Sequence, residues 1–353
     1  MTNRELILKL EKDSHLTKDE FSILLSSYTQ SDILFAREKA QQIAKAHFGN
    51  KVYMRGLIEF TNICSRNCYY CGLRYGNNNI SRYRLSEEEI LSCCREGYNL
   101  GFRTFVLQGG EDPYFTDNKM CSIIEKIKYS FPDCVITLSI GEKSRETYQK
   151  YFDAGARRYL LRHETANDKH YSIIHPKEMS LANRKKCLYD LMDIGFQTGC
   201  GFMVGSPEQT FETLADDLTF IADLKPHMVG IGPFIPHKDT PFGNEPQGDL
   251  DLTLFLLSLV RIMLKTVLLP STTALGTIHP DGREMGILSG ANVVMPNLSP
   301  ILVREKYMLY NNKISTGEET AEGVANLKEQ MLKIGYKIIN SVGNHPDIKQ
   351  KGR

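Results

Sequence analysis

Two kinds of segment alternate along most of this sequence, and the alternation limits the fold more than any other feature. Short runs of β-branched and apolar residues, typical of strands, are followed by longer amphipathic segments, typical of helices. The predicted strands are 52–61, 104–109, 134–140, 157–164, 197–204, 228–235, 270–275 and 291–296. The helices predicted between them include 86–100, 119–131, 143–154, 180–194, 208–223 and 250–266. The expected class is α/β, as a single (β/α)₈ TIM barrel, with a doubly wound open sheet as the structural alternative.

The chain is expected to form one domain with an addition at each end. Residues 1–50 mix charged and apolar positions at a period of three to four, which predicts a helical N-terminal extension. Residues 51–310 then form the barrel, and residues 311–353 form a short C-terminal tail packed on it. No low-complexity linker or short-period repeat divides the chain.

Charge and cysteine content exclude several classes of protein. The 353 residues carry 43 Lys and Arg against 42 Asp and Glu, so the formal charge of +1 gives no general attraction to nucleic acid or to an anionic membrane. The N-terminus lacks the apolar core of a secretory signal, and Arg261 and Lys265 interrupt the longest apolar run, as in a buried helix. These features predict a cytoplasmic protein, in which nine cysteines favour metal binding over disulfides.

Three cysteines lie close together in "CSRNCYYC", directly after the first predicted strand. Loops that follow barrel strands meet at one end, where barrel enzymes have their active sites, so Cys64, Cys68 and Cys71 are the candidate catalytic and metal-binding residues. A structural zinc site uses four ligands. Three thiolates on a four-iron cluster instead leave one iron free to bind another molecule, which explains the missing ligand. A zinc site completed from a distance and a group of free thiols are the alternatives.

The spacing C-x₃-C-x-aromatic-C, with Tyr70 in the aromatic position, resembles the signature of the radical S-adenosylmethionine (SAM) superfamily. The resemblance implies one 4Fe–4S cluster on the three cysteines, SAM on the free iron, and reductive cleavage of SAM to a 5′-deoxyadenosyl radical. The run "QGGEDPY" after the second strand resembles the motif that contacts the amino group of SAM in these enzymes. Glycines let a backbone approach a ligand closely, although a plain turn before Pro113 would have the same composition.

Longer phrases resemble one branch of that superfamily, the HydE maturases of FeFe-hydrogenase, from about residue 5 to residue 310. These phrases are "IEFTNIC", "LQGGEDPYF", "RYLLRHETAN", "VGIGPFIPHKDTP", "TTALGTI" and "GANVVMPN". Biotin synthase and methylornithine synthase share parts of the pattern. Some HydE proteins hold an accessory cluster with three further cysteines near the C-terminus. The matching stretch here, "KISTGEETAEGVANLKEQ", has none, so no accessory C-terminal Fe–S cluster is expected.

Alternation along the barrel strands predicts a charged interior. Helices cover the outer face of a barrel strand, so apolar residues belong there and the residues between them point inward. This places Arg55 and Glu59 of the first strand, with Arg158, Arg162 and Glu164 of the fourth, inside the barrel. Buried arginines need a partner or an anionic ligand. We therefore expect a cavity for a small anionic or carboxylate-bearing molecule; the alternative is a structural network of Arg55 with Glu59 and of Arg162 with Glu164.

The resemblance to HydE implies further site residues. The SAM site would comprise Tyr70, Gln108, Gly109, Gly110, Glu111, Ser139, Glu164 and Arg184. The substrate cavity would add to Arg55 and Glu59 the residues Arg158, Arg162, Thr272, Thr273, Met295, Tyr307 and Tyr310. Two simpler interpretations stay open: Met295 as ordinary core, and Arg184 as a solvated helix charge. His237 is expected to be a loop residue without a catalytic role.

The resemblance also implies a function. The enzyme would act on a small iron complex with carbonyl, cyanide and cysteine-derived groups, in assembly of the FeFe-hydrogenase H-cluster. Its partners would be this small molecule, soluble maturation proteins and an electron donor, and the enzyme itself would be a monomer. The alternatives are a radical SAM mutase or synthase of the methylornithine or biotin type, and a non-catalytic iron–sulfur carrier. A carrier has little use for an arginine-rich barrel interior.

Overall fold

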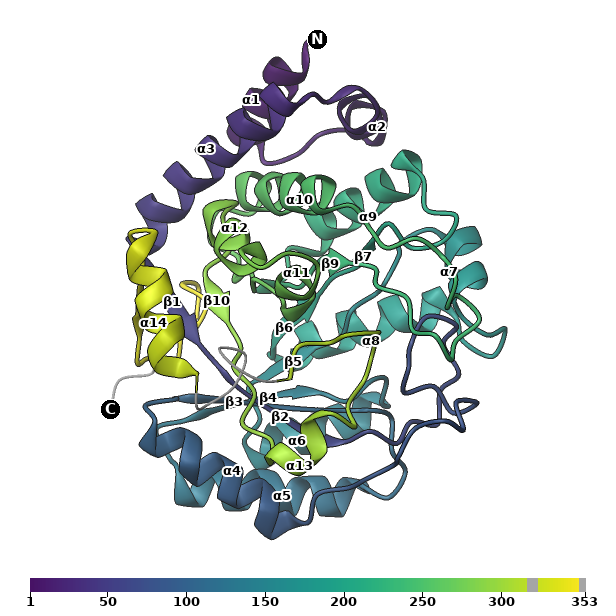
Figure 1. Ribbon diagram of the computed structural model, residues 1–353, viewed down its shortest axis with the longest axis vertical. Helices are drawn as coiled ribbons and strands as arrows, with labels where there is room; N and C mark the ends of the chain where they lie inside the picture. The colour runs from purple at the N-terminus through teal and green to yellow at the C-terminus, as the bar shows by residue number, and fades with distance from the viewer. Residues whose placement is uncertain (316–322, 349–353) are drawn as a thin grey trace.

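Parallel strands form a ring at the centre of the computed structural model, which describes residues 1–315 and 323–348 (Figure 1). The main sheet has the order β2-β3-β4-β5-β6-β8, a second has β10-β1-β11, and β7 pairs with β9. The strands are β1 (Lys51–Met54), β2 (Gly56–Thr61), β3 (Thr104–Gly109), β4 (Val135–Ser139), β5 (Arg158–Leu160), β6 (Gln197–Cys200), β7 (Met203–Val204), β8 (Met228–Val229), β9 (Gly232–Pro233), β10 (Val293–Val294) and β11 (Lys337–Ile339).

Isolated parallel bridges join these sheets into a barrel. The bridges are Met228–Leu268, Pro270–Val293 and Leu57–Asn297. The pairing thus runs from β8 through residues 268–270 to β10, and from there back to β1 and β2. This parallel arrangement confirms the predicted α/β barrel.

Four predicted strands are absent or divided in the structure, and one of them, 228–235, divides into β8 and β9. The segment 270–275 is not a strand, because within it only Pro270 makes a bridge and a helix begins at Thr273. The first predicted strand divides at Arg55 into β1 and β2, and 197–204 divides into β6 and β7. The division of 197–204 lies at Gly201, whose φ is +152° and where a Cβ would lie 1.9 Å from the carbonyl oxygen of Gly230. Only glycine allows the two backbone segments, at residues 201 and 230, to approach so closely.

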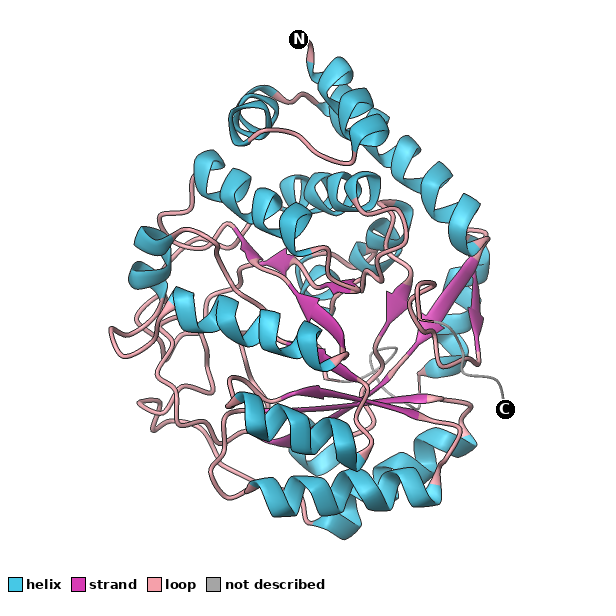
Figure 2. Cartoon of the chain, turned by 180° about the vertical axis from the view of Figure 1, so that it is seen from behind, coloured by secondary structure: helices cyan, strands magenta, loops and turns pink. Residues whose placement is uncertain are grey.

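Helices cover the outside of the ring (Figure 2). Those that follow the strands of the main sheet are α4 (Glu87–Asn99), α5 (Asp117–Ser130), α6 (Arg145–Ala154), α7 (Asp168–Ile174), α8 (Leu181–Ile194) and α9 (Phe211–Leu224). The second half adds α10 (Leu250–Met263), α11 (Thr273–Ile278), α12 (Gly282–Leu288), α13 (Ile301–Arg304) and α14 (Val324–Lys333). None of the helices in the described ranges is long and apolar enough to cross a membrane.

The N-terminal helices lie outside the barrel (Figure 1). They are α1 (Asn3–Asp13), α2 (Lys18–Ser27) and α3 (Gln30–Phe48), and capping boxes at Thr2 and Thr17 satisfy the first amides of α1 and α2. α3 packs along α10, and α2 packs on α9. Contacts on both sides leave α10 almost wholly buried, which explains its apolar sequence. Its Arg261 is fully buried and donates to the carbonyl oxygens of Gly290 and Lys265, each at 2.9 Å.

The C-terminal part is more than a tail. β11 adds to the outer edge of β1, which the sequence did not predict. The residues that follow lie beneath the barrel, because they bind the first residues of β3, β5 and β6: the carbonyl of Val342 accepts from Thr104 at 2.9 Å and from Arg158 at 2.6 Å, and Asn344 accepts from Gln197 at 2.9 Å. Parts of the predicted tail, 316–322 and 349–353, lie outside the described residues.

Candidate active site

The three clustered cysteines lie on the loop after β2, at the end of the barrel formed by the carboxyl ends of the strands. Backbone amides of Arg66 and Glu111 each lie 3.4 Å from the Cys64 sulfur. Burial raises the pKa of the Cys64 thiol and raises that of Cys68 to about 12. A buried thiolate is stable only beside positive charge, which an iron centre supplies. The donor set therefore fits an iron–sulfur cluster, and among residues 1–315 and 323–348 no three His, Cys, Asp or Glu side chains converge on a single metal ion.

The glycine run after β3 packs directly on the cysteine loop. A Cβ at Gly110 would lie 2.2 Å from the carbonyl oxygen of Ile63 and 2.6 Å from the Cβ of Cys64, so only glycine fits. The amide of Ser65 donates to the Glu111 carbonyl at 2.9 Å. The Glu111 carboxylate is also occupied, by Arg66 Nε at 2.8 Å and by the amide of Glu142 at 3.0 Å. The side chain of Glu111 thus links the glycine run to the cysteine loop and to the loop after β4. The backbone at Gly109 borders the cavity described next.

A cavity of about 300 Å³ opens beside the cysteines and brings most of the predicted residues together. Those that line it are Cys68, Tyr70, Cys71, Gln108, Gly109, Ser139, Arg162, Glu164, Arg184, Tyr307 and Tyr310. They come from the ends of β2, β3, β4 and β5, from α8, and from the segment after α13. Since the ends of parallel strands meet at one rim, residues distant in sequence converge there.

Charged residues of both signs line this cavity. Arg162 Nη2 lies 3.0 Å from Glu164 Oε2, so this half of the predicted structural network exists. Burial raises the pKa of Glu164, and Arg162 and Arg184 oppose that rise. Glu164 has a φ of +67°, a conformation that costs a non-glycine residue energy and is concentrated at functional sites. Arg184 is buried and paired with Glu142 at 2.8 Å, so it is not a solvated helix charge.

Comparisons with known proteins identify the family of this chain. The pattern of the Radical SAM superfamily matches residues 58–221. A curated relative, the FeFe hydrogenase maturase subunit HydE of Thermotoga maritima, is 43% identical over 340 residues, which cover 96% of this chain and 96% of that protein. The chain belongs to the HydE family. It is therefore a radical SAM enzyme, and membership implies a 4Fe–4S cluster and SAM as cofactors.

More distant relatives share the HydE fold. The 3-methylornithine synthase of Methanosarcina acetivorans is 26% identical over 290 residues, 81% of each chain. The crystal structure of methylornithine synthase (PylB) superposes with a TM-score of 0.82 at 24% identity, covering 95% of this chain and 97% of that one. The structure of the FeFe-hydrogenase maturase HydG gives a TM-score of 0.81 at 18% identity, covering 96% and 77%. These structures support the fold alone.

Some residues expected in the HydE substrate cavity lie elsewhere. Arg158 is fully buried beneath the barrel, where Thr104, Val342 and Asn344 accept its hydrogen bonds, which corrects its predicted position. Glu59 pairs not with Arg55 but with Lys313 Nζ at 2.8 Å, and it accepts from Asn297 at 2.7 Å.

The other expected residues lie near the main cavity. Arg55 and Met295 line a smaller cavity of about 20 Å³, which shares Leu160 with the larger one. Thr272 is the N-cap of α11 and Thr273 its first residue, and Ala274 of this helix lines the main cavity in their place.

The sequence analysis missed a histidine beside the aromatic residue of the cysteine motif. His175 Nδ1 donates to the carbonyl of Tyr171 at 3.2 Å, so Nε2 is the acceptor that receives the Tyr70 hydroxyl at 3.1 Å. Burial lowers the pKa of His175 to about 3, which keeps the ring neutral. A lone histidine in "SIIHP" gives no signal of this role.

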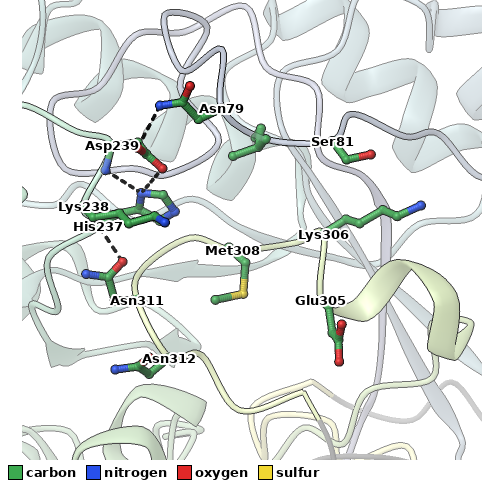
Figure 3. A pocket seen from close by; sticks show the side chains of 11 residues that line it. Asn79, Ser81, His237, Lys238, Asp239, Glu305, Lys306, Met308, Asn311 and Asn312 are labelled. Carbon is green, nitrogen blue, oxygen red and sulfur yellow. Dashed lines mark hydrogen bonds and ion pairs between the residues drawn. The ribbon is translucent and has the colours of Figure 1, made fainter.

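Residues 305–312 form a wall between the main cavity and an outer pocket of about 560 Å³. Figure 3 shows the outer pocket. Tyr307, Leu309 and Tyr310 face the inner cavity, whereas other residues of the wall face the outer pocket. Those that face outward are Glu305, Lys306, Met308, Asn311 and Asn312. The amide of Gly72, directly after Cys71, donates to the Leu309 carbonyl at 2.8 Å. His237 lines the outer pocket and is not among the residues that line the main cavity.

Proposed function

We propose that this chain cleaves SAM reductively and acts on a small anionic iron complex in assembly of the FeFe-hydrogenase H-cluster. The observation that carries the proposal is the convergence of the cysteine loop, Arg162, Glu164 and Arg184 on one cavity at the mouth of the barrel. The cluster and SAM, when bound, supply the radical chemistry. The protein's own part is to bind, to orient and to exclude water.

The part of the cavity beside the cysteines suits SAM. Arg184 is held by Glu142 at one side of its guanidinium and borders the cavity, so it can pair with a carboxylate through charge-assisted bonds. Glu164 can accept from an ammonium or a hydroxyl group, which would favour its charged form against the effect of burial. The Tyr70 ring gives an apolar wall, and Gln108 and Ser139 add polar groups.

The deeper part suits a small anion. Arg55 is almost fully buried, and its Nε and Nη2 have no hydrogen-bond partner. The hydroxyl of Thr137 in the same small cavity has none either. A buried unpaired cation is costly, so an anionic ligand nearby would relieve the cost. A compact iron complex with carbonyl and cyanide ligands is such an anion; it would lie in the main cavity against Arg162, Tyr307 and Tyr310, on the side toward Arg55.

The proposal includes a single cluster. No cysteine follows Cys200 in the sequence, so thiolates for an accessory C-terminal cluster are lacking. The enzyme would act as a monomer, with an electron donor and a soluble maturation protein as transient partners.

The test is anaerobic reconstitution with iron and sulfide, followed by assay of SAM cleavage and of maturation in a hydrogenase-positive anaerobe that lacks its own HydE. We expect about four irons per chain, formation of 5′-deoxyadenosine and restored hydrogenase activity. Failure in that strain, with rescue of one lacking methylornithine or biotin synthase, would establish the synthase alternative. A protein that binds a cluster but never cleaves SAM would be a carrier.

A further inference from the structure

Two arginines and two glutamates alternate across four separate segments beside the cavity. Arg66, between Cys64 and Cys68, lies with Nε 2.8 Å from Glu111 Oε2 and with Nη2 3.5 Å from Glu142 Oε2. Glu142, which follows β4, lies with Oε1 2.8 Å from Nε of Arg184 in α8. The chain of charges therefore links the cysteine loop, the glycine loop, the loop after β4 and α8.

The two carboxylates of this series of charges, those of Glu111 and Glu142, each have more than one hydrogen-bond or ion-pair partner. Glu142 is 8% exposed, and its Oε2 also accepts from Asn183 Nδ2 at 2.8 Å. Its amide donates to Glu111 Oε1 at 3.0 Å. The preceding Gly141 has a φ of +76°, and a Cβ there would lie 2.2 Å from the Glu111 side chain. The loop after β4 is thus shaped to bring Glu142 against Arg184.

Arg184 is the member that meets the cavity. It is 7% exposed, and the Glu142 carboxylate approaches it at Nε. Burial alone would lower the pKa of Arg184, but Glu142 and its neighbours raise it, so the guanidinium stays charged. A guanidinium fixed before a ligand arrives loses less entropy when it forms two bonds to a carboxylate.

We infer that Glu142 and Arg66 are positioning residues for SAM. Glu142 fixes the direction in which Arg184 meets the ligand's carboxylate, and Arg66 holds the loop between Cys64 and Cys68 against the glycine loop. The inference rests on the proposed function, because it takes SAM as the ligand of the main cavity.

The test compares Glu142→Gln with Glu146→Gln in the reconstituted enzyme under dithionite. Glu146 is an exposed neighbour, and its variant is the matched control. Each variant is assayed for iron content, thermal melting with and without SAM, the spectral change of the reduced cluster as SAM is added, and KM and kcat for 5′-deoxyadenosine formation. We expect Glu142→Gln to raise KM and the SAM concentration for half-maximal spectral change by about tenfold, with kcat much less affected. The control should match the wild type, and Glu142→Asp should recover part of the loss.

A Glu142→Gln variant with full iron and unchanged KM would overturn the inference. If that variant loses iron or melts early, Arg66→Gln decides, since the Arg66 side chain is 33% exposed and easier to replace. Arg66→Gln should also raise KM for SAM while retaining iron, and an unchanged KM there would overturn the inference in the same way. If the wild type itself shows neither SAM cleavage nor a SAM-dependent spectral change, the proposed function fails first.

Discussion

Replacing Lys313 by methionine removes one member of a buried ion pair and leaves Glu59 without a compensating charge. The Lys313 and Glu59 side chains are 5% and 0% exposed, and Nζ lies 2.8 Å from Oε1. Asn297 still donates to the other carboxylate oxygen, but an amide does not neutralise a charge. Breaking a buried pair in this way costs about 3–5 kcal/mol. With an unfolding entropy of about 2.1 cal/mol/K per residue over 353 residues, the loss corresponds to a fall in Tm of roughly 4–7 °C.

The assay is thermal melting of the wild type, Lys313→Met, and the double variant Lys313→Met with Glu59→Gln. The double variant should recover most of the loss, because both charges are then removed. Lys333→Met is the control, since Lys333 and Glu329 form an i,i+4 pair with side chains 68% and 67% exposed and such pairs contribute little. If Lys313→Met melts together with the wild type and the control, the buried pair does not stabilise the fold and the reasoning is refuted.

Three further predictions concern the site. Replacing any of the three loop cysteines by alanine should lower bound iron and abolish SAM cleavage, whereas Cys121→Ala should do neither; full turnover in a loop variant would reject the cluster assignment. Arg55→Met should raise Tm by removing a buried, largely unpaired cation, yet weaken binding of an anionic substrate by about 10- to 150-fold; unchanged or stronger binding would contradict the anion site. Between pH 6.5 and about 3, His175 binds a proton in the unfolded chain but not in the folded one, so the free energy of unfolding falls by up to about 1.4 kcal/mol for each unit by which the pH is lowered. His175→Gln should remove this contribution, and an unchanged dependence of stability on pH would contradict the shift.

The alternation of strand-like and helix-like segments along the sequence predicts the barrel well, because the pair of segments recurs many times. It fails at 270–275, where Thr272 and Thr273 favour a strand by residue type but form the N-cap and the first residue of α11 instead. Strand propensity depends on the neighbours that a segment meets, and here the chain has left the ring after Pro270.

Alternation correctly places charged residues away from the helices, but it does not say how far along the barrel axis each one lies. Arg158 begins β5, so it meets the C-terminal segment beneath the barrel and not the cavity above. Glu59 forms its ion pair with Lys313, and the Tyr70 hydroxyl forms its hydrogen bond with His175; both partners are distant in sequence. Contacts of this kind depend on the tertiary fold and leave no local pattern.

β1 has both of its neighbours, β10 and β11, in the last part of the chain. During synthesis at about 5–20 residues per second, the interval between β1 and β11 lasts roughly 15–60 s. Throughout that interval, β1 has at least one unpaired edge, and such edges favour pairing with other chains. The bottom of the barrel likewise stays open until Val342 and Asn344 have left the ribosome. Protein production at lower temperature, or with chaperones that shield strand edges, should therefore improve the yield of this chain more than that of a barrel whose first strand pairs with the next one synthesised.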